Sequence, residues 1–404
     1  MKVTEDNITL TPTIVQYKKP RSSSHTPPIP ETNYDKTNCL GALYCLQFLV
    51  MSKSFKNILI IKPSSLGDIV MALPALNALR HSFPDAKISW LIRPEFAPLL
   101  KNHPHLTNTI LFDRKFLGKA WFHPRALHFL LSLICLLRRS RFDLVIDLQG
   151  LFRTASLAWL SACKKRFGMT NARELAHIFY THKVPQNQDC IHVVDYYLKV
   201  TQAAGASDLP AQFVLPVDTA DADSVNRMLT AHNTDVNNYA VFIPGSTHRP
   251  KCWPVERFAA LADKVSSQFN LAIVATGTAS EKSIAENLKN LANVPITNLA
   301  GLTNLSQLVA LLKAAKLVVS NDTGPGHIAV ALGLPLVMIF GPSNPIRLFP
   351  YRRPETMAAV DPFGRGLKLQ SSDPAHAIEA ITVDAVYQKV CEQIEQRPPQ
   401  PDNV

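Results

Sequence analysis

The sequence lacks the features that identify several large classes of protein. No apolar run in its 404 residues reaches the ~18–20 residues that a membrane-spanning helix needs. Its seven cysteines include no C-x-x-C pair, and their number is odd, so the sequence indicates neither a zinc site nor a disulfide framework. This use of cysteine favours a reducing, cytosolic compartment. No G-x-G-x-x-G follows any predicted strand, which argues against a dehydrogenase.

Negative charge is also scarce. The chain has 31 Asp and Glu residues against 42 Lys and Arg, a formal net charge of +11. This excess favours an anionic partner, either nucleic acid, a membrane surface or a phosphorylated substrate, unless it serves solubility alone. A hydrophobic content of 47% and a charged content of 18% are typical of a folded α/β protein, and the length predicts two domains.

Composition also indicates where the folded part lies. Residues 1–38 are polar and proline-rich, and we expect them to be disordered. The apolar patch 39–51 is either a membrane-surface helix or part of an extension that adds nothing to the chemistry. We therefore predict an extension over 1–50 and a tail over 397–404. Between them we expect domains at 51–215 and 216–396, joined by a linker within 205–223 and ending in a helix over 375–396.

The first domain shows polar loops after buried strands. Residues 57–62 predict a strand, followed by a tight loop to Asp68 and a helix over 69–80. Asp68 is either a helix-capping or first-turn charge, or a carboxylate base that faces a cleft between the domains. A second strand over 144–147 leads to Gln149 and a helix from Leu151, where Arg153 either binds an anionic acceptor or is solvated at the surface.

The segment 114–141 is strongly basic, with apolar residues interleaved. This pattern is typical of a basic amphipathic helix at a membrane surface or an anionic lipid. The simpler interpretation is a helix that packs on the sheet and has a solvated cationic end.

The second domain repeats the arrangement. A strand over 239–243 is followed by hydroxyl side chains and by Lys251, which suit a diphosphate because lysine places a point charge on phosphate oxygens. A strand over 271–276 precedes a helix that begins near Glu281. That carboxylate either binds ribose hydroxyls or is a favourable first-turn charge.

The stretch 317–343 organises this half of the chain. It predicts a strand over 317–320, a turn over 323–327, a helical pattern over 328–332 and a second strand over 336–340. Open parallel sheets bind ligands where strands end, and small residues there let backbone N–H groups approach an anion such as a diphosphate. The alternative is an ordinary glycine-rich turn.

Four motifs occur here in one order over two domains, and through them the chain resembles the family-nine glycosyltransferases, the ADP-heptose:lipopolysaccharide heptosyltransferases. The similarity extends over residues 56–395. Within the family, KPSSLGD and DLQG are most similar to heptosyltransferase I, which adds the first heptose to the Kdo sugar of lipid A. The four motifs are IIKPSSLGDIVMALPALNAL at 60–79, DLQG at 147–150, PGSTHRPKCWP at 244–254 and SNDTGPGHIAVALGLPLVMIFGPS at 320–343.

The resemblance implies a GT-B architecture, in which two Rossmann-like domains face a cleft, with acceptor on the first and donor on the second. Asp68 matches the general base and Lys251 the lysine that stabilises the leaving diphosphate. The implied donor-binding residues are Ser246, Thr247, Lys251, Glu281 for the ribose, Leu302 for the adenine, and Asp322, Thr323, Gly324 and His327 in the donor loop. The implied acceptor-binding residues are Ser65, Gly67, Gln149 and Arg153.

The resemblance also implies partners. ADP-heptose would be the co-substrate and Kdo-bearing lipid A the acceptor, with no metal, no other cofactor and no nucleic acid. The enzyme would work in the cytoplasm, peripherally on the inner face of a Gram-negative inner membrane. The long extension and Pro325-Gly326 in the donor loop depart from the family pattern.

Two alternatives remain at this point. One is another sugar transferase or a nucleotide-sugar epimerase on the same architecture. The other is a non-catalytic nucleotide-sugar-binding protein, against which the presence of both Asp68 and Lys251 speaks.

Overall fold

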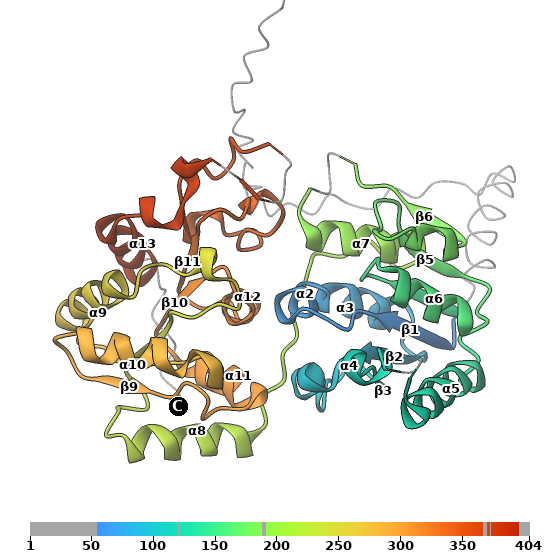
Figure 1. The fold of residues 1–404 in the computed structure, drawn as a ribbon, viewed down its shortest axis with the longest axis horizontal. Coiled ribbons are helices and arrows are strands. Elements are labelled where there is room, and N and C mark those ends of the chain that lie inside the picture. The colour runs from blue at the N-terminus through green and yellow to red at the C-terminus, as the bar shows by residue number, and fades with distance from the viewer. Residues whose placement is uncertain (1–54, 120–121, 188–190, 367–369, 372, 396–404) are drawn as a thin grey trace, which may run out of the picture. The chain divides into compact units, whose positions relative to one another are not determined.

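The computed structural model describes residues 55–119, 122–187, 191–366, 370–371 and 373–395. The expected extension over 1–50, the apolar patch 39–51 and the tail over 397–404 lie outside these residues. The described chain contains two parallel six-stranded sheets with helices between the strands (Figure 1). The α/β class and the GT-B type of architecture are confirmed.

The first sheet has the strand order β3-β2-β1-β4-β5-β6. Its central strands β1 and β4 are almost wholly buried apolar runs, as expected for a parallel sheet covered on both faces. Its strands are β1 (Asn57–Ile61), β2 (Lys87–Ile92), β3 (Asn108–Leu111), β4 (Leu144–Asp147), β5 (Arg166–Met169) and β6 (His182–Val184). Its helices are α2 (Leu66–Met71), α3 (Leu73–Ser82), α4 (Arg114–Leu117), α5 (Pro124–Arg139), α6 (Phe152–Leu160) and α7 (Val193–Ala203).

The second sheet has the order β12-β11-β10-β7-β8-β9. Its strands are β7 (Tyr239–Ile243), β8 (Ala272–Ala275), β9 (Ile296–Asn298), β10 (Leu317–Asn321), β11 (Leu336–Phe340) and β12 (Met357–Ala359). Its helices are α8 (Thr219–Ala231), α9 (Val255–Phe269), α10 (Lys282–Leu291), α11 (Leu305–Ala314), α12 (Gly324–Ala331) and α13 (Val383–Glu395). Short 3-10 helices include η1 (Pro94–Leu100), η2 (Ala176–Phe179) and η4 (Arg249–Lys251).

Both sheets are doubly wound in the same way. In the first, β1 pairs with β2 on one side and with β4 on the other, so the winding reverses between β1 and β4. In the second, β7 pairs with β8 and with β10, and the winding reverses between β7 and β10. A crevice opens at each such point beyond the carboxyl ends of the strands, and ligands bind there. The loops after β1, β4, β7 and β10 are therefore the ones to inspect for function.

Several expected elements differ in their bounds. The single helix expected over 69–80 is two helices, α2 and α3, because the chain turns at Ala72 before Pro74. Helix α12 begins at Gly324 rather than 328, and α13 begins at Val383 rather than 375. The expected linker over 205–223 already contains the start of α8 at Thr219.

The predicted domain boundary at 215/216 stays a prediction. Contacts group residues 54–404 as one compact unit. One apolar cluster contains buried residues of both sheets, such as Ile58 of β1 and Val318 of β10. Among the described residues, no helix is both long enough and apolar enough to cross a membrane.

Candidate functional site

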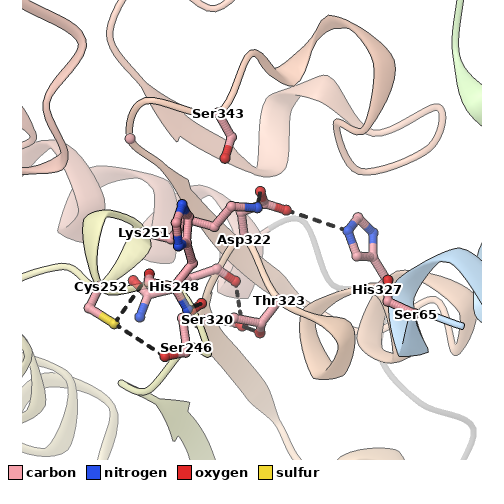
Figure 2. Close-up of polar contacts among 12 residues, drawn as sticks. Ser65, Ser246, His248, Lys251, Cys252, Ser320, Asp322, Thr323, His327 and Ser343 are labelled. Carbon is pink, nitrogen blue, oxygen red and sulfur yellow. Dashed lines mark hydrogen bonds and ion pairs between the residues drawn. The ribbon is translucent and has the colours of Figure 1, made fainter. Parts of the chain in front are cut away.

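The donor loop after β10 contains a buried carboxylate held between two nitrogen side chains. Lys251 Nζ lies 2.5 Å from Asp322 Oδ2, and His327 Nε2 lies 3.6 Å from Asp322 Oδ1 (Figure 2). Burial alone would raise the pKa of Asp322, but His327 and Lys251 outweigh it and lower the pKa to about 2. Asp322 is therefore ionised at neutral pH and orients the lysine and the histidine.

Asn321, to which sequence reasoning gave no role, connects this loop to the loop after β7. Its Oδ1 accepts a hydrogen bond from the Trp253 backbone N–H at 3.0 Å, and its Nδ2 donates to the Pro244 carbonyl at 2.9 Å. The side chain is fully buried and well satisfied. Asn321 therefore fixes the segment that carries Lys251 against the donor loop.

Glu281 is held at the ends of β7 and β8. Its Oε2 accepts hydrogen bonds from Thr278 N–H and Thr278 Oγ1 at 2.7 and 2.8 Å, so the first-turn interpretation of this residue is correct in part. A Cβ added to Gly245 would lie 2.6 Å from Glu281 Cδ, so a larger residue there would have to displace the Glu281 side chain. The Glu281 carboxylate therefore packs against Gly245, and its hydrogen bonds to Thr278 fix its orientation.

Thr276, directly after β8, was also missed. Its side chain is almost fully buried, it lines the pocket described below, and its Oγ1 has no hydrogen-bond partner among the described residues. A buried hydroxyl without a partner is costly, so a polar group of a bound ligand is the natural partner. The signal in the sequence was a hydroxyl residue at the carboxyl end of a predicted strand.

In the first domain, Asp68 serves as a capping residue of α2. Its Oδ2 accepts hydrogen bonds from the backbone N–H of Ser65 at 3.1 Å and from Ser65 Oγ at 2.8 Å. Its side chain nevertheless remains 31% exposed. The capping interpretation is therefore correct, and the exposed carboxylate is still available to a ligand.

Lys62, the polar residue that follows β1, lies beneath Asp68. Its side chain is 4% exposed, its Nζ is 3.9 Å from Asp68 Oδ2, and it lies 5.3 Å from the centre of the Tyr197 ring. Burial would raise the pKa of Asp68, but Lys62, the Ser65 hydrogen bonds and His327 lower it below its usual range. Lys62 therefore keeps the carboxylate ionised.

We expect Lys62→Met to move the acid limb of the pH profile of kcat/KM to higher pH. Without the ammonium, burial raises the pKa of Asp68, so a higher pH is needed to ionise it. The measurement is initial rate against pH for the wild type, Lys62→Met and the control Lys87→Met, an exposed lysine at the amino end of β2. An unshifted acid limb in Lys62→Met would show that Lys62 does not set the ionisation of Asp68.

The helices that carry Asp68 and His327 touch each other. A Cβ added to Gly67 of α2 would lie 2.7 Å from His327 Cδ2, and one added to Gly324 of α12 would lie 2.7 Å from Leu66 Cβ. Glycine at both positions lets the helices approach this closely. The starts of the helices after β1 and β10 therefore face one another.

These loops surround one pocket of about 610 Å³. Glu95 and Phe96 of η1 complete its wall on the side of the first sheet. The wall includes most of the residues chosen from the sequence. They are Ser65, Gly67, Asp68, Ser246, Thr247, Lys251, Glu281, Asp322, Thr323, Gly324 and His327.

Three chosen residues do not line this pocket: Leu302, Gln149 and Arg153. Leu302 is 51% exposed, and the residues that follow it, Thr303 and Asn304, line the wall instead. Gln149 Oε1 accepts a hydrogen bond from the Ser64 backbone N–H at 3.3 Å. Its side chain therefore supports the loop that leads to Asp68. Contact of these three residues with donor or acceptor stays a prediction.

The described residues contain no group of three or more His, Cys, Asp or Glu side chains that could hold a metal ion. Cationic and N–H donors lie at the same wall: the Lys251 ammonium and the start of α12. Such groups stabilise a departing anion where they are aimed at it. The expectation of no metal stays a prediction.

Residues 130–376 match the sequence model of a family described as Glycosyltransferase family 9 (heptosyltransferase). The chain is 30% identical over 294 residues to lipopolysaccharide heptosyltransferase 1 of Escherichia coli, covering 71% of this chain and 88% of the relative. It is 26% identical over 309 residues to lipopolysaccharide core heptosyltransferase OpsX of Haemophilus influenzae, covering 76% and 84%.

A solved structure of E. coli heptosyltransferase WaaC with ADP superposes with a TM-score of 0.66 at 27% identity, covering 83% of this chain and 99% of that chain. The doubly wound sheets, the pocket between their switch points and the family match agree. The chain belongs to glycosyltransferase family 9, the heptosyltransferases, and is an enzyme of glycosyl transfer.

Proposed function

We propose that the chain transfers heptose from ADP-heptose to the Kdo sugar of the lipopolysaccharide inner core, with inversion and with Asp68 as the general base. One observation carries this function: an ionised, partly exposed carboxylate and the Lys251–Asp322 ion pair, of which Asp322 is buried, line the same pocket. The relatives named above are lipopolysaccharide heptosyltransferases, and the WaaC structure contains ADP.

In the proposed reaction, the acceptor hydroxyl gives its proton to Asp68 while its oxygen bonds to the anomeric carbon of the heptose. The bond from that carbon to the diphosphate oxygen breaks, and ADP leaves with the bonding electron pair. Attack from the side opposite ADP inverts the centre. Lys251 and the start of α12 take up the negative charge that develops on the diphosphate.

Glu281 would bind the ribose hydroxyls of the donor, and Thr276 Oγ1 would hydrogen-bond to the same nucleoside. Both side chains line the wall between β7 and β8, and Glu281 is fixed there by Thr278 and Gly245. The diphosphate would lie towards Ser246, Thr247 and Lys251. We propose that the enzyme acts in the cytoplasm, peripherally on the inner face of a Gram-negative inner membrane.

The experiment that tests this function is turnover of the purified full chain with ADP-heptose and Kdo-bearing lipid A, followed by mass analysis of the lipid. We expect a mass gain of one heptose and release of ADP. Parallel reactions with UDP-sugars separate this activity from that of another sugar transferase or an epimerase. Turnover with a UDP-sugar and none with ADP-heptose would contradict the proposed donor.

A further inference from the structure

Helix α5 packs against the protein along a narrow stripe only. Its buried residues are Ala126, Leu133 and Leu137, of which the two leucines belong to the apolar cluster on one face of the first sheet. The remaining apolar side chains of this sixteen-residue helix have little or no part in that core.

The α5 outer face, formed by Leu127, Leu131 and Cys135, turns away from that stripe. These residues are four apart and so share one side of the helix, and all three are exposed. Leu131 is 57% exposed. A contiguous exposed apolar patch on a protein surface is typical of a site that binds another protein or a membrane.

Helices α4 and α6 both contact α5. Phe116 of α4 packs on Phe129 of α5 with ring centres 5.8 Å apart, and Arg138 of α5 donates a hydrogen bond to the Leu160 carbonyl of α6. Trp159 of α6 is 54% exposed and packs on Phe179 of η2, with ring centres 6.2 Å apart.

The charge around this surface has one sign. No Asp or Glu occurs between Asp113 and Asp143, and all the Lys and Arg residues of that segment are exposed. They are Arg114, Lys115, Lys119, Arg125, Arg138, Arg139 and Arg141. Apolar side chains ringed by cations are complementary to a bilayer with anionic headgroups.

One end of this surface, formed by α4 and the start of α5, lies at the edge of the sheet where the strands end. Helix α4 follows the carboxyl end of β3, and the loop to Asp68 follows the carboxyl end of β1 in the same parallel sheet (Figure 1). Helix α5 begins near that edge, at Pro124. An acceptor anchored in a bilayer on this side would therefore approach the edge that carries Asp68.

We propose that the α5 outer face, with the surrounding cations of segment 114–141, docks on an anionic phospholipid bilayer and so presents a lipid-linked acceptor to the pocket. This inference rests on the proposed function for its acceptor. The docking itself is independent of the sugar that is transferred.

The test is co-sedimentation of the full chain with vesicles of phosphatidylglycerol and phosphatidylethanolamine, and with vesicles of phosphatidylcholine alone. We expect binding to the anionic vesicles only, weakened by salt. Leu131→Glu, which adds a negative charge to the apolar stripe, should weaken binding at least tenfold. The matched control is Leu291→Glu on α10, a leucine that is 48% exposed and should bind as the wild type does.

Turnover separates a failure of docking from a failure of the proposed function. Leu131→Glu should retain the wild-type rate on a water-soluble Kdo acceptor and lose rate on the same acceptor in anionic vesicles. Equal vesicle binding by Leu131→Glu and Leu291→Glu would overturn the inference. A dimer in sedimentation velocity that Leu131→Glu dissociates would also overturn it, because a second copy would then cover the face. A loss of thermal stability confined to Leu131→Glu would point to a covering segment of the chain itself and would have the same consequence.

Discussion

Asp68→Asn is expected to lower kcat for heptose transfer by about 10²–10⁴-fold while leaving the affinity for ADP nearly unchanged. The amide has almost the shape of the carboxylate and can still accept the hydrogen bond from the Ser65 N–H. It cannot accept the proton of the acceptor hydroxyl. Because the pKa of Asp68 is lowered, the wild-type base is ionised throughout the neutral range. Asparagine has no titratable carboxyl group, so a rise in pH within that range should not restore the activity of the variant.

The control for this variant is Ser65→Ala, because Asp68 has two roles that must be separated. Both substitutions weaken the same capping box of α2, and the loss of a cap costs about 0.5–2 kcal/mol of stability. Only Asp68→Asn removes the base. We therefore measure kcat, ADP affinity and thermal stability for both variants. If the two lose kcat equally with saturating acceptor, the carboxylate acts only as a cap, and the base assignment is wrong.

The strands could be predicted from sequence where they are long and central. The predicted strands over 144–147, 239–243 and 336–340 have the observed bounds, because a parallel strand buried on both faces is a largely continuous apolar run. Strands β5, β6, β9 and β12 were not predicted. They have three or four residues each, lie towards the sheet edges, and contain charged or small side chains that give no such run.

The start of α12 was missed for a different reason. Glycine and proline at 324–326 were taken as a turn because both disfavour helix interiors. Proline is accepted in the first helical turn, where its missing N–H is not needed, and the helix begins there at the edge of the pocket. These residues therefore gave no sequence signal for the helix start that lines the pocket.

Asp68 and Lys251 could be chosen from the sequence, but Lys62 and Asn321, which support them, could not. Asp68 and Lys251 stand after strands and belong to motifs, whereas the support of Asp68 by Lys62 depends on the path of the chain through space. Lys62 occurs in the sequence as the last residue of an expected strand, without a signal for burial. The same holds for Asn321, whose two hydrogen bonds join loops about seventy residues apart.

Lys251→Met is expected to lower kcat by about 10²–10³-fold and to weaken ADP binding as well, because the cation stabilises the diphosphate both before and during departure. The substitution also leaves Asp322, whose side chain is 4% exposed, without its ion-pair partner at 2.5 Å. Its pKa should then rise, since burial opposes the charged form. A loss of activity in this variant alone would therefore have two explanations.

A double-mutant cycle with Asp322→Asn distinguishes them. If Lys251 acts on the diphosphate itself, Lys251→Met should still lower kcat strongly in the Asp322→Asn background, where no buried charge is left unpaired. If Lys251 serves only to neutralise Asp322, the double variant should turn over as fast as Asp322→Asn alone. The cycle is read from kcat and from ADP affinity by calorimetry, with thermal unfolding to confirm that all four proteins are folded. The first outcome assigns the lysine to the leaving group, because in that background the cation can act only on the substrate.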